Sequence, residues 1–310
     1  MRAVVMAYQD IGYVCLDALL ELGVEVGAVV THADDAGEDI WFRSVAERAR
    51  RANIPVLVTE SVNAPAVVAR LRQMAPEFLF SFYFRQILSA EILGIPTRGA
   101  LNLHGSLLPR YRGRCPVNWA LVNGESKTGA TLHYMERKAD TGDIVAQHEV
   151  PIADDDTALT LNRKLGEAAR ALLRETIPQL AAGTAPRLPQ DHAAATYFGG
   201  RRPEDGRMTW SATALQLYNL IRAVTHPYPG AFTTWRGERL FVWWATPAPR
   251  ATPSVPGTVL AVGDGVVVAT GDGTLRLRQV QVASGPDERA EVFARRVGLE
   301  VGDQLGLGDA

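Results

Sequence analysis

Short apolar runs alternate with amphipathic segments through the first two thirds of the chain. The apolar runs are typical of buried β-strands, and the segments between them repeat apolar residues at helical spacing. This alternation indicates βαβ units around a parallel or mixed sheet that helices cover on both faces. The expected strands are 3–7, 24–30, 56–58, 78–82, 99–104, 129–135 and 144–150, and the expected helices are 11–22, 44–52, 64–74, 117–122 and 159–180.

The pattern changes beyond residues 181–203, a stretch with several prolines and the pair Gly199-Gly200 that suits a linker. After one more helical segment, 215–224, short β-type runs are separated by Gly-Asp-Gly turns. We therefore expect two domains: a Rossmann-like α/β domain over residues 1–203 and a small, OB-like β-barrel over residues 204–310. The expected strands of the second domain are 231–235, 240–245, 257–262, 266–270 and 274–283.

Charge and cysteine content narrow the class of protein. The net charge is −2, from 32 basic and 34 acidic side chains, which argues against nonspecific binding of nucleic acid. Arg110, Arg112 and Arg114 lie close together in the sequence, so a local basic patch stays an alternative. Cys15 and Cys115 do not suggest a disulfide framework, and no Cys/His spacing fits a metal site. The sequence shows neither a signal peptide nor an apolar run of ~18 residues, so we expect a cytoplasmic protein without membrane insertion.

Asn102-Leu103-His104 ends one of the apolar runs, immediately before Gly105. Because side chains alternate along a strand, Asn102 and His104 project from the same face. Ligands of open α/β sheets usually bind beyond the carboxyl ends of the strands. There an amide can donate to an oxyanion, and an imidazole can move a proton near neutral pH. The spacing alone is also compatible with an alternative in which Asn102 and His104 only form hydrogen bonds with local backbone groups.

Asp140 lies in a polar loop, residues 138–143, between two expected strands. Sheet topology can bring such a loop to the end of a neighbouring strand, so we expect Asp140 beside His104. A carboxylate next to an imidazole favours the charged ring and raises its pKa. A turn aspartate without a chemical role stays the alternative.

Residues 104–116 read His-Gly-Ser-Leu-Leu-Pro-Arg-Tyr-Arg-Gly-Arg-Cys-Pro, with an apolar centre between polar, glycine-marked ends. With Asn102-x-His104 and Asp140-x-Gly142, this segment resembles the folate-dependent formyltransferases, which include methionyl-tRNA formyltransferase. The chain is similar above all to the part of the bifunctional polymyxin-resistance protein that formylates UDP-4-amino-4-deoxy-L-arabinose. That likeness extends over nearly the whole chain, through residues 7–8, 80–83, 99–114, 118–119, 121–125, 144–147, 198–202, 222–224 and 227–232.

The resemblance implies formyl transfer from 10-formyltetrahydrofolate, without a metal, in lipid A modification and polymyxin resistance. It implies direct attack by an unprotonated amine, with Asn102 and protonated His104 stabilising the oxyanion and Asp140 raising the pKa of His104. The bifunctional protein also has a decarboxylating half. Because this chain has no dinucleotide fingerprint, we expect it to catalyse the formyl transfer alone. The residues implied for folate binding are Gln86, Ile87, Leu88, Arg114, Glu136, Arg137, Lys138 and Ala139.

The acceptor is less closely specified. An arginine fork suits the pyrophosphate of a nucleotide sugar, and an aromatic ring suits its base. The candidates are Arg112, Arg201, Arg202, Arg222, Tyr228, Trp243 and Trp244, for which solvated or core positions stay open.

Four other functions also stay open. They are a methionyl-tRNA formyltransferase, a formyltransferase for another amino-sugar nucleotide, a hydrolase that releases formate, and a binding protein without activity. Residues 204–310 contain arginines but no lysine, and acidic residues offset them, so we expect no nucleic-acid partner. A homo-oligomer is left open.

Overall fold

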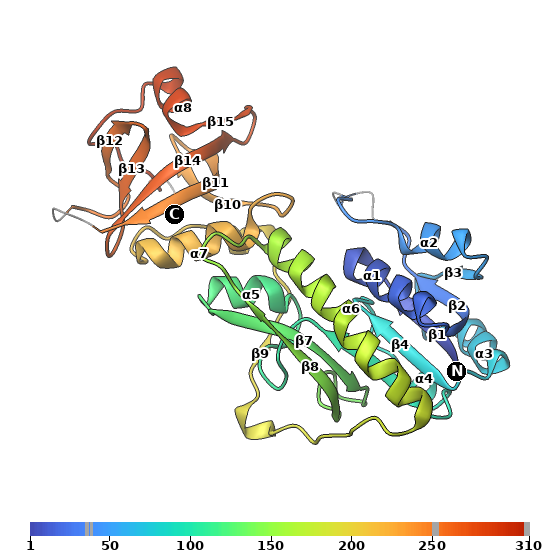
Figure 1. The fold of residues 1–310 in the computed structure, drawn as a ribbon. Coiled ribbons are helices and arrows are strands. Elements are labelled where there is room, and N and C mark those ends of the chain that lie inside the picture. Colours follow the sequence, from blue (N-terminus) through green and yellow to red (C-terminus); the bar gives the residue numbers. More distant parts are fainter. Residues whose placement is uncertain (35–36, 38–39, 250–253, 307–310) are drawn as a thin grey trace. The chain divides into compact units, whose positions relative to one another are not determined.

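The computed structural model describes residues 1–34, 37, 40–249 and 254–306. The chain packs into two compact units (Figure 1). The first takes residues Met1–Pro116, Ser126–Ile152 and Leu161–Gly199, and the second takes Val117–Glu125, Ala153–Thr160 and the chain from Gly200 onward. The second unit therefore includes two short segments that precede most of helix α6 (Ala158–Ala182) in the sequence.

The first unit is built on a seven-stranded sheet in the order β3-β2-β1-β4-β5-β7-β8. The first five strands of this order pair in parallel, whereas β7 pairs antiparallel with β5 and with β8. The strands are β1 (Arg2–Ala7), β2 (Glu25–Thr31), β3 (Val56–Val58), β4 (Phe78–Phe82), β5 (Gly99–His104), β7 (Lys127–Tyr134) and β8 (Ile144–Pro151). The helices and short elements around them are α1 (Gln9–Glu21), α2 (Val45–Arg51), α3 (Pro65–Met74), α4 (Ala90–Leu93), β6 (Arg112–Gly113), η1 (His192–Ala194) and β9 (Tyr197–Phe198).

The central strands are buried on both faces, which explains their uninterrupted apolar sequences. On β1, Val4 and Met6 belong to an apolar cluster that includes residues of α3 and α4. Val5, between them, is fully buried as well. Helix α6 (Ala158–Ala182) buries Leu161, Leu165, Leu172 and other apolar residues at helical spacing. Its Arg170 forms ion pairs with Asp17 and Glu21 of α1.

The second unit contains a six-stranded antiparallel sheet in the order β10-β11-β14-β13-β12, with β15 paired to β14. Its strands are β10 (Ala231–Trp235), β11 (Glu238–Ala248), β12 (Val259–Gly263), β13 (Gly265–Ala269), β14 (Thr274–Val282) and β15 (Asp287–Arg289). Helix α7 (Ala214–Val224) packs on β11, and α8 (Ala290–Val297) packs on β14. The helix α5 (Pro116–Val122) and the turn η2 (Pro203–Gly206) complete the elements.

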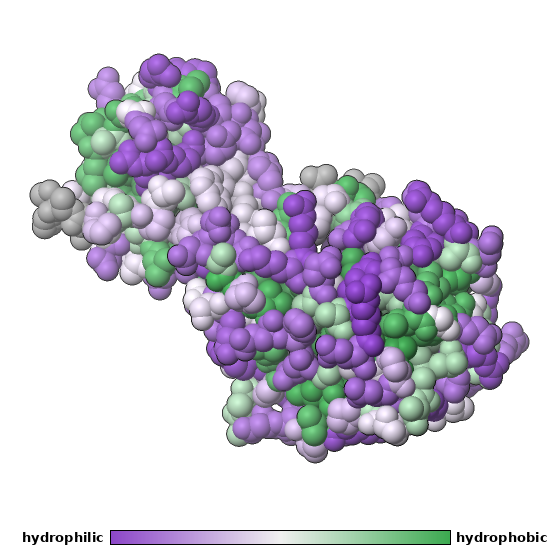
Figure 2. Space-filling model, viewed as in Figure 1, coloured by the Kyte–Doolittle hydropathy of each residue, from purple (hydrophilic) through white to green (hydrophobic). Residues whose placement is uncertain are grey.

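The expected fold class, a mixed α/β sheet followed by a β-domain, is confirmed. The elements that the sequence pattern did not predict are short or strongly charged: α4, α8, β6, β9, β15 and the two 3₁₀ turns. None of the helices within the described residues is long and apolar enough to cross a membrane. On the face shown in Figure 2, hydrophilic residues cover much of both units, and apolar residues form separate patches.

The amino-terminal cap of α7 offers a test of local stability. Thr213 Oγ1 accepts from the Gln216 N–H at 3.1 Å, and Gln216 Oε1 accepts from the Thr213 N–H at 3.0 Å. Thr213→Ala removes one half of this capping box, so we expect a loss of about 1 kcal/mol in the free energy of unfolding of the second unit. Urea unfolding followed by tryptophan fluorescence measures it. Thr213→Ser is the control, and equal stability of all three proteins would contradict the cap.

Candidate active site

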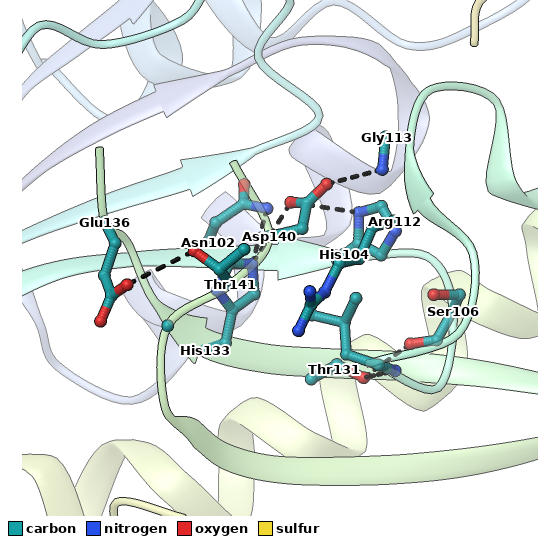
Figure 3. A network of polar contacts seen from close by, with 12 residues as sticks. Asn102, His104, Ser106, Arg112, Gly113, Thr131, His133, Glu136, Asp140 and Thr141 are labelled. Carbon is teal, nitrogen blue, oxygen red and sulfur yellow. Dashed lines mark hydrogen bonds and ion pairs between the residues drawn. The ribbon is translucent and has the colours of Figure 1, made fainter. Parts of the chain in front are cut away.

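Two antiparallel strands bring the polar side chains of the candidate site together. Asn102 of β5 pairs with His133 of β7, and His104 pairs with Thr131. Directly opposed residues of neighbouring strands have their side chains on the same face. The four side chains therefore line one strip of the sheet, at the carboxyl end of β5 (Figure 3).

Asp140 reaches this strip from the loop between β7 and β8. Its Oδ1 lies 3.6 Å from His104 Nδ1 and 3.6 Å from His133 Nε2, and its Oδ2 accepts from the Gly113 N–H at 2.8 Å. The expected neighbourhood of Asn102, His104 and Asp140 is thus present. The loop turns sharply, because Asp140 has a φ of +59° and a Cβ on Gly142 would lie 2.1 Å from the Tyr134 carbonyl oxygen.

The two ionisable groups of this contact have pKa values displaced in the same direction. Burial lowers the pKa of His104 below its ordinary value, although Asp140 and the Tyr111 carbonyl both act to raise it. Burial alone would raise the pKa of Asp140, but the His104 ring, the His133 ring and the Gly113 amide together hold it well below its usual range. The expectation of a raised His104 pKa is therefore wrong in its net direction. Asp140 acts as expected, and burial outweighs it.

Hydrogen bonds fix the orientation of both imidazole rings. His104 Nε2 lies 2.7 Å from the Tyr111 carbonyl oxygen, which can only accept, so Nε2 carries a hydrogen and Nδ1 faces Asp140. His133 Nδ1 likewise lies 2.8 Å from the Tyr134 carbonyl oxygen. In the neutral ring its Nε2 accepts from Asn102 Nδ2 at 3.2 Å. The second hydrogen of the Asn102 amide is left to donate elsewhere.

Residues 190–198, which the sequence pattern assigned to a linker, support the loop that contains Asp140. Gln190 Nε2 donates to the carbonyl oxygens of Asp140 and Gly142, at 3.0 and 2.7 Å. Gln190 Oε1 accepts from Nε and Nη2 of Arg112, at 3.2 and 2.6 Å. The short strand β9 pairs with β6, which contains Arg112 and Gly113. One buried glutamine thus joins the Asp140 loop to the strand whose amide binds Asp140.

The loop that follows His104 is anchored to the same strands. Thr131 Oγ1 donates to the Ser106 carbonyl oxygen and accepts from the Leu108 N–H, at 2.6 and 3.2 Å. Gln147 of β8 donates to the Leu108 carbonyl oxygen at 2.8 Å. The apolar Leu-Leu-Pro segment is therefore fixed by backbone bonds, which places the Tyr111 carbonyl against His104.

Most residues expected to bind folate lie in two loops that start from one apolar cluster, and Arg114 follows β6. Leu88 belongs to this cluster, and Met135, which precedes Glu136, packs against it. Asn63 Nδ2 donates to the Ile87 carbonyl oxygen at 2.9 Å, and Ile87 has a 71% exposed side chain. Arg114, Glu136, Arg137, Lys138 and Ala139 are also exposed, and Gln86 is partly buried. The apolar cluster and the Asn63 bond hold the start of these loops, and their outer residues are exposed to solvent.

Two of the arginines expected to contact the acceptor are packed inside the protein. Arg112 is 1% exposed and bonds to Gln190, Tyr197 and His192. Arg222 is 5% exposed and donates to the carbonyl oxygens of Ala153 and Asp156. These two arginines therefore hold backbone and side chains of their own units, and we assign neither to a pyrophosphate.

The remaining acceptor candidates lie in the second unit. Arg201 lies over the Trp119 ring, 4.6 Å from its centroid, and Arg202 pairs its N–H with Asp205. Trp243 is buried and stacks on the His226 ring at 3.6 Å. The last two are partly buried: Trp244, which meets the Tyr218 ring edge to face, and Tyr228.

Sequence reasoning missed His133, Gln190 and the role of the Tyr111 and Gly113 backbone. His133 lies in a strand that was expected, so the missing information was the register of β7 against β5. Gln190 lies between Pro189 and Asp191 in a segment without apolar periodicity. Nothing in the local sequence of Gln190 indicates its role.

An amide, an imidazole and a buried carboxylate at the carboxyl end of a strand in a mixed α/β sheet define an enzyme site suited to acyl transfer. The family model for the formyl transferases matches residues 10–177, and the model for their C-terminal domain matches residues 201–298. The chain belongs to the formyl transferase family, and its expected classification as a formyltransferase is confirmed.

Several solved structures share the fold. WlaRD, a sugar 3N-formyl transferase crystallised with dTDP and 5-N-formyl-THF, is 20% identical, with a TM-score of 0.69 over 92% of this chain and 99% of its own. The N-formyltransferase of Helicobacter canadensis, with folinic acid and dTDP-3-aminofucose, is also 20% identical, with a TM-score of 0.69 over 93% and 99%. HypX from Aquifex aeolicus, with tetrahydrofolic acid, is 17% identical, with a TM-score of 0.66 over 97% and 48%. At these identities the likeness establishes the fold.

Gln190→Glu tests the support of the Asp140 loop. The carboxylate keeps both bonds from Arg112 and gives this buried cation a counter-charge, but it cannot donate to the carbonyl oxygens of Asp140 and Gly142. We expect a melting temperature close to that of the wild type and a kcat about 10- to 100-fold lower, because a misplaced catalytic group can cost that much. Gln281, which bonds Trp243 and Gly285 in the second unit, supplies the control Gln281→Glu. Unchanged kcat in Gln190→Glu would contradict the support.

Proposed function

We propose that the protein transfers the formyl group of 10-formyltetrahydrofolate to the amine of a nucleotide-linked 4-amino sugar. The observation that carries the proposal is the Asn102–His104–Asp140 arrangement. Asn102 Nδ2, His104 Nε2 and Asp140 Oδ2 each have a hydrogen-bond partner, and His104 Nδ1 faces Asp140. The loops at 86–88 and 136–140 fit a pterin, whose amide edge can be recognised by backbone groups. The donors of this site support acyl transfer without a covalent enzyme intermediate, since the co-substrate carries an activated formyl group.

Each group has one task in the proposed reaction. The unprotonated amine attacks the formyl carbon, and the free hydrogen of Asn102 Nδ2 donates to the oxygen that becomes negative. His104, neutral at the start, takes up the proton of the attacking nitrogen at Nδ1 and returns it to the leaving nitrogen. Asp140 stays ionised and stabilises the imidazolium that forms between these steps. His133 keeps the Asn102 amide in its donating orientation.

The nature of the acceptor is supported from two directions. The structurally similar sugar formyltransferases contain dTDP or a dTDP-linked amino sugar together with a formyl folate. The sequence blocks shared with the polymyxin-resistance protein favour UDP-4-amino-4-deoxy-L-arabinose among such acceptors. We therefore propose this sugar as the substrate, and lipid A modification as the process that it serves.

The pH dependence of the reaction tests the role of His104. Its lowered pKa means that the neutral base is present down to pH values below the ordinary histidine range and is lost as the pH falls through that pKa. In Asp140→Asn the charge that favours the imidazolium is removed, so we expect the acid limb of kcat/KM to move to still lower pH. The rate itself should fall ~10²–10⁴-fold. The pH profiles of the wild type and of Asp140→Asn are measured with the same acceptor, so that the ionisation of its amine is the same in both and the difference reports the enzyme group. An acid limb that moves to higher pH in Asp140→Asn would refute the assignment.

Asn102→Ala tests the oxyanion donor separately. Removal of one such donor lowers kcat by ~10²–10³ while folate binding should persist, because the expected folate contacts lie in other loops. Single-turnover rates and the dissociation constant of 5-formyltetrahydrofolate measure the two quantities. The control Asn123→Ala changes an asparagine just beyond α5 that has no part in the proposed reaction. A wild-type single-turnover rate in Asn102→Ala would argue against the mechanism.

Product analysis tests the acceptor. The protein is incubated with 10-formyltetrahydrofolate and, in separate reactions, UDP-4-amino-4-deoxy-L-arabinose, dTDP-linked 3- and 4-amino sugars, and methionyl initiator tRNA. We expect a mass gain of one formyl group on the UDP sugar. Formylated tRNA would overturn the proposal, and formate without any acceptor would indicate a hydrolase.

A further inference from the structure

A cavity of about 350 Å³ lies in the first unit, beside the catalytic strip but separate from it. It lies at the carboxyl ends of β1, β2 and β3. Its wall includes Tyr8, which follows β1, and the last residues of β2 and β3, Thr31 and Val58. Its volume lies in the ordinary range for small-molecule sites, ~300–1,000 Å³. The wall residues that carry the argument are Tyr8, His32, Asp34, Phe42, Arg43 and Arg50.

The position of this cavity in the sheet is one at which nucleotides bind in doubly wound folds. The strand order reverses between β1 and β4, because β2 and β3 lie on one side of β1 and the later strands lie on the other. Ligands of such sheets bind at the carboxyl ends of the strands beside this reversal. The turn after β1 begins with Tyr8 and Gln9 in place of a glycine-rich loop, so a dinucleotide is not the ligand that this turn suits.

Three rings and one carboxylate form the part of the wall nearest to β1 and β2. The Tyr8 ring lies 5.2 Å from the Phe42 ring and 5.3 Å from the His32 ring, at interplanar angles of 71° and 88°. Asp34 follows β2, and its Oδ1 accepts from the Tyr8 hydroxyl at 3.1 Å. In nucleotide-binding sheets an acidic residue near the end of the second strand accepts from ribose hydroxyls. Rings and carboxylate together suit a nucleoside.

Arginines supply positive charge around the same cavity. Arg50 lines it and forms no ion pair with any residue that the structure describes. Arg43 also lines it, paired with Asp10, and Arg85 lies over the Tyr8 ring at 4.7 Å. Glu47, on the same wall, is paired with Arg51. An arginine without a carboxylate partner suits phosphate oxygens.

The cavity and the strip that contains Asn102 and His104 both lie at the carboxyl ends of the parallel strands. Met6 pairs with Val30, Ala7 with Phe82, and Phe82 with Leu103, so the carboxyl ends of β2, β1, β4 and β5 are neighbours in one row. Three spacings of neighbouring strands amount to roughly 14 Å. An extended nucleoside-diphosphate sugar can span such a distance, with its nucleoside at β2 and its amino sugar at His104.

The geometry points to this cavity as the subsite for the nucleoside diphosphate part of the acceptor, with Asp34 facing the ribose and Arg50 the diphosphate. The inference rests on the proposed function and deepens it. The tail of the folate is the competing occupant, since it too is aromatic and anionic. The loops expected to hold the pterin follow β4 and β7, however, and leave the β1–β2 end of the row to the other substrate.

Binding of UDP alone tests the subsite independently of formyl transfer. UDP, dTDP and 5-formyltetrahydrofolate are titrated calorimetrically into the full chain and into Arg50→Gln, Ala46→Phe and Asp34→Asn. Arg50→Gln should weaken UDP about tenfold, the effect of losing one charge-assisted bond. Ala46→Phe, which places a ring in the cavity, should abolish UDP binding. Asp34→Asn should weaken UDP more than dTDP, which lacks the 2′-hydroxyl. Binding of 5-formyltetrahydrofolate should not change, and Arg72→Gln, on α3, is the control for a lost surface charge.

Activity then separates this inference from the proposed function. With the UDP sugar, Arg50→Gln should raise KM by the same factor and leave kcat unchanged, because the diphosphate is bound equally in the ground and transition states. UDP binding without any formyl transfer would overturn the proposed function alone. Wild-type UDP binding in both Arg50→Gln and Ala46→Phe would overturn the subsite. Weakened 5-formyltetrahydrofolate binding in these variants would reassign the cavity to the folate tail. Thermal melting confirms that each variant is folded.

Discussion

A carboxylate that is taken out of water needs compensating partners, and the Asp140 side chain, 10% exposed, obtains them from separate parts of the chain. Gly113, whose amide donates to Asp140, lies in β6. The His133 and His104 rings, which favour the ionised carboxylate when they take up a proton, lie on β7 and at the end of β5. The site can form only where all of these segments meet. The same burial that keeps His104 neutral makes the Asp140 charge effective when the ring takes up a proton.

Much of this organisation can be predicted from the sequence. The long helices and central strands follow from their apolar periodicity, as the buried positions of α6 show. Asn102, His104 and Asp140 could be selected because their spacing matches a family pattern. His133 could not, since its role depends on the register between β5 and β7. The structural roles of Gln190 and Arg112 could not be predicted either, because β6 and β9 are two-residue strands that pair across 85 positions of the sequence. The net direction of the His104 pKa depends on burial, which no local motif reveals.

Under the proposed function, the arrangement of strands gives two large substrates separate routes to one carbon atom. The loops after β4 and β7 start from one apolar cluster, whereas the cavity lies at the ends of β1 and β2. His32 belongs to the cavity wall, and its Nε2 accepts from the Arg85 N–H at 3.0 Å, one residue before the first of these loops. The Gln86 side chain is held in turn by the Val62 N–H at 2.7 Å. These hydrogen bonds connect the cavity wall to the loop after β4.

The contacts of Gln190 and of β9 bear on how formyltransferase modules can be recombined in evolution or in the laboratory. The family model of the catalytic part matches only as far as residue 177, yet the hydrogen bonds that fix the Asp140 loop come from Gln190, and β9 ends at Phe198. A chimaera joined directly after α6 would inherit Asn102, His104 and Asp140 without the hydrogen bonds that support the Asp140 loop. A transferable piece must therefore extend at least through Phe198, and it includes residues 117–125 and 153–160, which pack with the second unit.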